Sequence, residues 1–291
     1  MPGDGLYFFG NQPREFFMKV YIHTDIEGVA GFCFFENRQS RDMECINHRY
    51  RMYQLLTSEV NAAVKACFDA GADEVIVNDN HGTGYNILFE QLDERCQIIH
   101  GRSSTGSDWL EFLDETFDAL VIIGAHAMAE TPCAITPHSK WCVNNGEIYL
   151  SEASMAAALA GDMDIPTVMA SGDDKIGAEL LAKMPDLEFA QVKRAVSPYL
   201  ACSMIPSAAC KLIYRKVSEG LARRKEIKPY KVQGPVELIL FDSDNHAPPL
   251  HSYGDAVTAE TISEAFWQYG RQRPGNKKDL KYVDGFQFPV Q

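Results

Sequence analysis

In the stretch MKVYIHTDIEGVAG, residues 18–31, an apolar run is followed at once by the acidic pair Asp25 and Glu27, and the fold prediction rests on this pattern. Two later stretches repeat this design. DEVIVNDNHG carries His81 just past an apolar run, and ALVIIGAHA carries His126 in the same position. Ligands of parallel α/β proteins gather at the carboxyl ends of the strands. The three stretches therefore predict three buried strands whose ends share one site.

The remaining chain alternates short Val- and Ile-rich runs with longer helical patterns. This alternation predicts an α/β fold with a mainly parallel sheet flanked by helices. Strands are expected at 18–24, 73–78, 119–123, 166–170, 188–194 and 235–241. Helices are expected at about 49–70 and near 151–160, 174–183, 205–223 and 257–270.

The domain organisation is predicted from composition and from the position of the motifs. Residues 1–17 precede a second methionine and are set aside as an extension, since they lack the pattern of a secretory signal. Residues 18–195 carry every motif and form the predicted catalytic domain. A polar stretch near residue 195 would begin a smaller C-terminal α/β domain, residues 196–291, with a role in closing the site or in oligomerisation.

Composition and charge exclude several classes of partner. Hydrophobic residues make up 46% and charged residues 23%, and no run approaches the roughly 18 apolar residues of a membrane span. The formal charge of −13 disfavours nucleic acid and anionic membrane surfaces. The eight cysteines show no CxxC pair and no compact disulfide spacing. We therefore expect reduced thiols and a cytoplasmic protein.

Asp25 and Glu27 are the first candidate metal ligands. Residues two apart on an extended backbone point to the same side, so the two carboxylates can bracket one or two cations. Carboxylate oxygen and imidazole nitrogen suit zinc, and one carboxylate can bridge two ions. An acid pair at a strand end is more often a cap or a solvated loop. The coincidence at three strands favours the metal site.

Four further candidates each have an ordinary structural alternative. His81 lies in a turn-rich segment, and His126 would otherwise be a partly buried histidine bonded to a carbonyl. His138 lies in a proline-punctuated loop, where it is either a proton-transfer group or a surface histidine. Glu152 begins a predicted helix, and its cap and ligand interpretations are equally good.

The segment Gly172-Asp173-Asp174 closes a predicted strand and enters a predicted helix. The pattern is typical of a turn with a helix N-cap, and the alternative is a supporting role beside the metals.

Taken together, DIEGVAG, VNDNH, GAHA, SEASMAAALAG and DIPTVMASGDD resemble the zinc-dependent D-aminopeptidase family of metallopeptidases. The order and approximate spacing agree over most of residues 18–200. The resemblance implies two zinc ions per chain, with Asp25, Glu27 and His81 on one ion. It implies that Asp25 is shared with a second ion held by His126 and Glu152.

The resemblance also implies a catalytic role for His138 and an assembly of stacked pentameric rings, hence a homodecamer. Three departures from the family pattern bear on substrate choice. His23 stands where the family pattern has a small hydroxyl residue, and Met128 replaces a basic residue. The loop between His126 and His138 is one residue longer than in that pattern. The preference for D- or L-residues therefore does not follow from the resemblance.

The expected function is that of a dizinc aminopeptidase that removes N-terminal residues, possibly D-amino acids, from short peptides with a free N-terminus. One alternative is a zinc amidohydrolase acting on a non-peptide amide, with the same metal chemistry. Another is a metal- or solute-binding protein without turnover, which would have no need of His138 beside an open metal position.

Overall fold

A computed structural model describes residues 17–34, 42–101, 109–243, 249–252 and 254–272 of the chain. The predicted extension, residues 1–17, lies outside the described residues except for its last residue. None of the helices in the described ranges combines the length and apolar composition that a membrane crossing requires.

The main sheet has seven strands in the order β3-β2-β1-β4-β7-β8-β9. Every neighbouring pair is parallel except β8 and β9, which are antiparallel. The strands are β1 (Lys19–Thr24), β2 (Glu74–Asp79), β3 (Gln97–Ile99), β4 (Ala119–Ala125), β7 (Thr167–Asp173), β8 (Glu188–Ser197) and β9 (Leu200–Ser203). Because β1 lies between β2 and β4, the ends of the three predicted site strands are adjacent.

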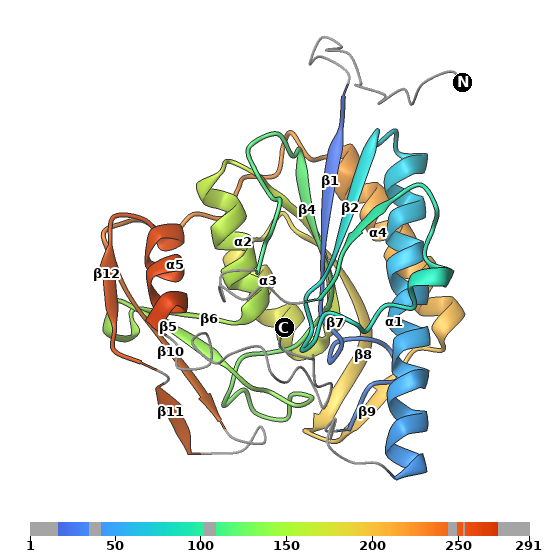
Figure 1. The fold of residues 1–291 in the computed structure, drawn as a ribbon, viewed down its shortest axis with the longest axis horizontal. Helices are drawn as coiled ribbons and strands as arrows, with labels where there is room; N and C mark the ends of the chain where they lie inside the picture. The colour runs from blue at the N-terminus through green and yellow to red at the C-terminus, as the bar shows by residue number, and fades with distance from the viewer. Residues whose placement is uncertain (1–16, 35–41, 102–108, 244–248, 253, 273–291) are drawn as a thin grey trace, which may run out of the picture.

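Helices cover both faces of this sheet (Figure 1). On one face α1 (Met43–Asp69) packs with α4 (Pro206–Ala222). On the other face lie α2 (Glu152–Asp162) and α3 (Asp174–Lys183). The predicted fold class, a mainly parallel sheet flanked by helices, is confirmed.

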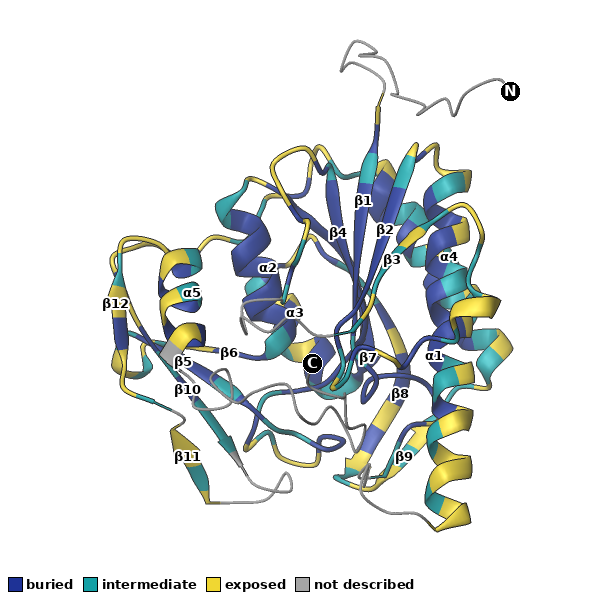
Figure 2. Ribbon diagram, viewed as in Figure 1, coloured by how far each residue is buried: buried dark blue, intermediate teal, exposed yellow. Residues whose placement is uncertain are grey.

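Two apolar clusters form the core, one on each face of the sheet. Alternate residues of β1 divide between them, since Tyr21 belongs to one cluster and Val20 and Ile22 to the other. This division follows from the two-residue period of a strand. Figure 2 shows the central strands largely buried, whereas the first turns of α1 are exposed.

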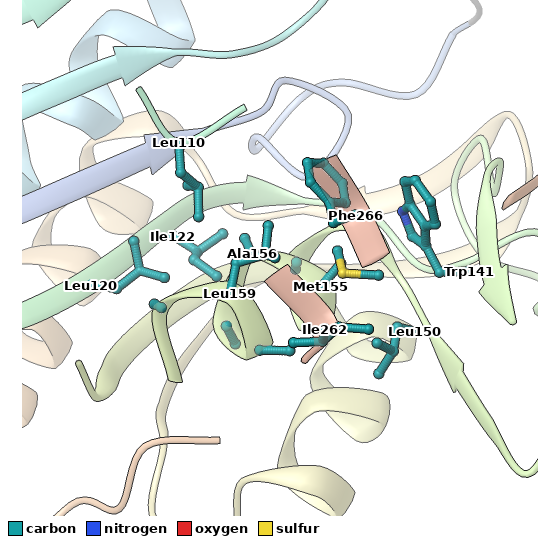
Figure 3. Packing of buried hydrophobic residues seen from close by; sticks show 14 of the residues in the cluster. Leu110, Leu120, Ile122, Trp141, Leu150, Met155, Ala156, Leu159, Ile262 and Phe266 are labelled. Atoms are coloured by element: carbon teal, nitrogen blue, oxygen red, sulfur yellow. The ribbon is translucent and has the colours of Figure 1, made fainter. Parts of the chain in front are cut away.

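A second sheet lies beside α2 and consists of antiparallel strands in the order β11-β10-β5-β6, with β12 paired to β10. Its strands are β5 (Lys140–Val143), β6 (Ile148–Leu150), β10 (Val236–Ser243), β11 (Leu250–Ser252) and β12 (Val257–Ala259). Helix α5 (Ile262–Gln272) covers this sheet, with the Phe266 ring 5.2 Å from that of Trp141 (Figure 3).

All six predicted strands are present, with small changes at their ends. The helix expected at 257–270 begins instead at Ile262, because Val257–Ala259 pairs with β10 as strand β12. The sequence did not predict β5 and β6, which are short and flank the 3-10 turn Asn144–Gly146; a second such turn is Phe89–Gln91. The boundary near residue 195 stays a prediction, and the second sheet contains strands from both sides of it.

Candidate metal centre

The candidate ligands meet at the carboxyl ends of the three central strands. Asp25 follows the last residue of β1, His81 lies two residues past β2, and His126 follows β4 directly. Figure 1 shows these strands running side by side, so their ends open onto the same edge. The juxtaposition that the sequence predicted is present.

Two groups of ligand atoms form around this edge. Asp25, Glu27 and His81 each place one ligand atom within 4.8 Å of the others. Within the first group the Nε2 atom of His81 lies 3.1 Å from Oε1 of Glu27. The second group, defined by the same 4.8 Å limit, contains His126, His138 and Glu152.

Asp25 connects the two groups. Its Oδ2 atom lies 3.5 Å from Nε2 of His126, which is itself 3.9 Å from Oε2 of Glu152. The other oxygen of Asp25 accepts a hydrogen bond from the backbone N–H of Ile26 at 2.9 Å. A carboxylate in this position can serve both groups, as a bridging ligand does.

Each of the three histidines is oriented through its Nδ1 atom. Nδ1 of His126 lies 2.8 Å from the carbonyl of Ala127, and Nδ1 of His138 lies 2.9 Å from that of Thr136. A carbonyl oxygen only accepts, so both nitrogens carry a proton and donate it. Metal ligation by imidazole commonly depends on such a bond at the opposite nitrogen. The Nε2 atom of His126, at the opposite side of its ring, faces Asp25 and Glu152.

The orientation of His81 comes from a turn built on Asp79. The carboxylate of Asp79 accepts from the backbone N–H groups of Asn86 and Ile87, at 2.6 and 2.8 Å, and from the Asn86 side-chain amide at 2.7 Å. Because the amide nitrogen of Asn86 donates there, its oxygen accepts from Nδ1 of His81 at 3.2 Å. The turn suggested by the sequence is therefore also what aims the histidine at Glu27.

The proline-rich loop brings His138 onto His126. Their rings stack with centroids 3.9 Å apart and an interplanar angle of 14°. The loop is held by Asp173, whose carboxylate accepts from the backbone N–H of Ile135 at 3.2 Å while it caps α3. The predicted N-cap at Asp173 is confirmed, and the same side chain supports the loop that carries His138.

Glu152 lies in the first turn of α2, but it is not the cap. The N-cap is Ser151, whose side chain accepts from the N–H of Ser154 at 3.2 Å. The carboxylate of Glu152 instead accepts from the hydroxyl of Ser139 at 2.7 Å through Oε1. Its Oε2 atom faces His126, as ligation would require.

The charges of the site strongly perturb one another. Burial and the neighbouring charge of Glu27 raise the pKa of Asp25 well above its usual value. Burial would also raise the pKa of Glu27, but the charge and hydrogen bond of His81 hold it well below its usual value. Like charges in contact at low solvent exposure favour a bound cation or a shared proton.

The second group shows the same competition. Burial would lower the pKa of His126, but the charges of Glu152 and Asp25 raise it well above its usual value. Burial would raise the pKa of Glu152, but His126 holds it far below its usual value. Burial and the charge of His126 lower the pKa of His138, which keeps this ring neutral near pH 7.

Two buried polar atoms of the site test whether a metal fits. Oε2 of Glu27 and Nε2 of His126 have no hydrogen-bond partner in the described part of the chain. Both side chains are almost fully buried, with 4% and 2% of their surface exposed. Buried polar atoms are rarely left without a partner, and a cation would supply one. The oxygen and nitrogen donors present are those that zinc accepts.

Sequence reasoning did not identify the residues that support this centre, among them Asn86, Ser139 and Lys193. The only local sign for Lys193 is that a charged pair, Lys193 and Arg194, interrupts the strand-like run FAQVKRAV. Its partners lie more than 160 residues away in the chain. The supporting roles of Asn86 and Ser139 depend on contacts that no local pattern reveals.

Comparisons with known proteins show what this chain is similar to. The sequence model of the D-aminopeptidase family matches residues 18–260. A D-aminopeptidase of Bacillus subtilis is 30% identical over 219 residues, which span 73% of this chain and 77% of that protein. A solved structure, described as the Zn-dependent D-aminopeptidase DppA from Bacillus subtilis, a self-compartmentalizing protease, superposes with a TM-score of 0.74 at 24% identity. That match covers 87% of this chain and 95% of the solved one and shows a common fold.

Proposed function

The chain belongs to the D-aminopeptidase family, which makes it a hydrolase, and from this premise we propose that it is a dizinc aminopeptidase acting on short peptides. The observation that carries the proposal is the convergence of two ligand groups on Asp25, with Glu27 Oε2 and His126 Nε2 buried and lacking a hydrogen-bond partner among the described residues.

The proposed ligand sets keep the first group and, in the second, take Asp25 in place of His138. Asp25, Glu27 and His81 would hold one zinc ion, and Asp25 would share the other with His126 and Glu152. When bound, zinc polarises the scissile carbonyl and lowers the pKa of a water molecule that becomes the nucleophile. With Asp25 shared, each ion would have three protein ligands, the number that a catalytic zinc site uses beside its open position.

His138 is the proposed catalytic residue. Its Nδ1 proton is committed to the carbonyl of Thr136, and its ring is held flat against His126. The lowered pKa keeps its Nε2 atom unprotonated and able to accept a proton at neutral pH. This atom can then return the proton to the departing amine nitrogen when the peptide bond breaks.

The substrate preference for a free N-terminus is argued from charge. Three carboxylates crowd the site, so a substrate ammonium group finds acceptors there that an acylated nitrogen cannot use. An exopeptidase gains its selectivity from such a contact. Blocking the substrate amine is therefore the most direct test of the proposal.

The experiment combines metal analysis with a substrate panel. Protein loaded with zinc is assayed on D- and L-dipeptides with free N-termini, on their N-acetylated forms, and on aminoacyl amides. We expect about two zinc ions per chain and cleavage only of compounds with a free amine. Equal cleavage of the acetylated forms would indicate a general amidase. Zinc bound without any turnover would indicate a binding protein, and a zinc content of zero would reject the metal centre.

Assembly and location complete the proposal. We propose a homo-oligomer, because the solved relative is described as self-compartmentalizing and because Tyr199, Leu200 and Ile205 expose 54%, 56% and 71% of their surface. A decamer predicts a particle of ten times the 32.5 kDa chain mass, which light scattering measures and which a monomeric mass would contradict. We propose a cytoplasmic location, where thiols stay reduced, and none of the eight cysteines is paired in the structure.

A further inference from the structure

Beneath the segment that carries Asp25 and Glu27 lies a buried lysine that the proposed chemistry does not use. Lys193 is in β8, and only 2% of its surface is exposed. Burying an ammonium group costs free energy unless its hydrogen bonds are satisfied. Burial lowers the pKa of Lys193 to about 8, against the opposing effect of nearby Asp173.

The three donors of this ammonium group all point at one turn. Nζ of Lys193 donates to the backbone carbonyls of Glu27, Val29 and Phe32, the last two at 3.0 and 2.8 Å. A lysine has three N–H donors and no acceptor, so these three bonds use its full capacity. The Lys193 side chain therefore bonds three buried carbonyls of the turn where the chain leaves the sheet.

A second buried side chain, from α1, holds the same turn. Oε1 of Glu59, in α1, accepts from the backbone N–H of Ala30 at 2.9 Å. Glu59 has only 2% of its surface exposed. The turn is also tied to β4, because the N–H of Gly28 donates to the carbonyl of Gly124 at 2.7 Å. Contacts from α1, β4 and β8 thus converge on the turn that carries the proposed ligand Glu27.

We infer that Lys193 and Glu59 are positioning residues that fix the backbone of residues 27–32 and thereby the geometry of the Asp25 and Glu27 ligands. The inference rests on the proposed zinc centre. An apolar side chain would fill the same space but would remove all three of these donors, and among the described residues only the Val29 carbonyl would keep a bond, from the N–H of Phe32 at 3.1 Å. Residues that orient ligands typically contribute about 10–100-fold to metal affinity or activity.

The primary test uses Lys193→Met, which keeps the length of the side chain and removes its donors. Zinc affinity is measured by competition with a chromophoric chelator, and thermal stability is measured on the metal-free protein. We expect zinc binding to weaken by about 10–100-fold, with a matching fall in kcat/KM. The matched control is Val217→Ala, a fully buried residue of α4, which should lower stability and leave zinc affinity unchanged.

A second pair of variants keeps the test decisive if Lys193→Met does not fold. Glu59→Gln retains an acceptor for the N–H of Ala30, whereas Glu59→Leu removes it. We expect wild-type zinc affinity for the first variant and roughly 10-fold weaker binding for the second. Equal zinc affinity of these two variants, or a Lys193→Met protein that loses stability but binds zinc normally, would overturn the inference and leave the proposed function standing. A wild-type protein that binds no zinc would instead reject the proposed function together with the inference.

Discussion

At the scale of single residues, the geometry of the site depends on side chains in which one polar atom is already held by a hydrogen bond. His81 is fixed through Asn86, and Glu152 is fixed through Ser139. In each residue, this hydrogen bond leaves the other polar atom directed at the metal centre. Ligand geometry set in this way needs no rearrangement when a metal binds, which lowers the cost of binding.

The first prediction separates chemistry from metal binding at two stacked histidines. His138→Ala should retain both zinc ions and lose about 10²–10⁴-fold in kcat, since a positioned acid-base group contributes that much to the rate. His126→Ala should lose zinc, because its Nε2 lies between Asp25 and Glu152. Metal analysis and steady-state kinetics check both. A His138→Ala enzyme with normal kcat would remove this residue from the mechanism.

The second prediction concerns the orientation of His81. Asn86→Ala removes the acceptor for Nδ1 of His81 and two donors to Asp79 and the His81 carbonyl. We expect zinc affinity to fall by about 10–100-fold, measured by chelator competition. Asn61→Ala is the matched control. This side chain also bonds two backbone groups, but they lie in a different loop from the one that carries His81. The same loss of affinity in the control would refute the prediction.

At the scale of elements, the decisive contact is the close approach of the turn after β1 to the end of β4. A Cβ atom on Gly28 would lie 2.1 Å from the carbonyl oxygen of Ala125. Gly124 has a φ of +80°, and its Cβ would lie 2.2 Å from the carbonyl oxygen of Asp25. Only glycine permits this approach, which sets the distance between Asp25 and His126.

The third prediction follows from that contact. Gly28→Ala should destabilise the fold by roughly 3 kcal/mol, since a methyl group forced against backbone requires the strands to move. It should also weaken zinc binding. Gly71→Ala is the control, because it has open space around it and a φ of +92°, so only backbone strain of about 1 kcal/mol is expected. Urea denaturation measures the loss of stability, and a chelator competition assay measures the loss of zinc affinity. Equal effects of the two substitutions would argue against the close approach.

At the scale of the whole molecule, the centre joins segments from both sheets. Asp242 of β10 accepts from the backbone N–H of Ser139 at 3.1 Å, and the Ser139 hydroxyl donates to Glu152. The second sheet therefore reaches the metal ligands through one residue. Metal binding should be linked to the stability of the entire fold.

The fourth prediction tests this linkage by removing zinc. A ligand present at about 1,000 times its dissociation constant stabilises a protein by roughly 4 kcal/mol. For a chain of this size, chelation should therefore lower the Tm by about 10 °C. Differential scanning calorimetry at fixed protein concentration measures the change. A Tm that is the same with and without chelator, in protein shown to bind zinc, would mean that the centre is not coupled to folding.

The fifth prediction is a pH dependence that belongs to Glu59. Burial raises the pKa of Glu59 from 4.5 to about 7, although the bond from Ala30 acts in the opposite direction. Between these values the folded state holds a proton that the unfolded state releases, so the unfolding free energy falls as pH rises from 4.5 to 7. The fall is at most about 3 kcal/mol.

Glu59→Gln removes the titrating group and should remove this slope. Urea denaturation of the metal-free proteins at several pH values gives the difference between wild type and variant. That difference should change steadily between pH 4.5 and 7 and stay constant above it. Parallel curves across this range would show that Glu59 titrates at its ordinary pKa.

The central strands and the position of the candidate ligands after them could be predicted from the local sequence alone. Asp25, His81 and His126 each follow an apolar run. Such a run is a local property of the chain, and it favours a strand that is buried in a parallel sheet. The order of elements around them then put the three ends at one edge. The helix starts near Glu152 and Asp174 were predictable for the same reason, since caps and periodicity act over a few residues.

The second sheet and the residues that hold the metal ligands in place could be seen only in the tertiary structure. Strand β12 is only three residues long, and its pairing with β10 depends on a segment about twenty residues earlier in the chain. Lys193 meets carbonyls 161 to 166 residues earlier in the chain, and Ser139 meets Asp242 103 residues later. Such contacts depend on how the packed elements close around a common centre. Hydrophobic periodicity records which side of an element is buried, but it does not record which distant polar group will face a given side chain there.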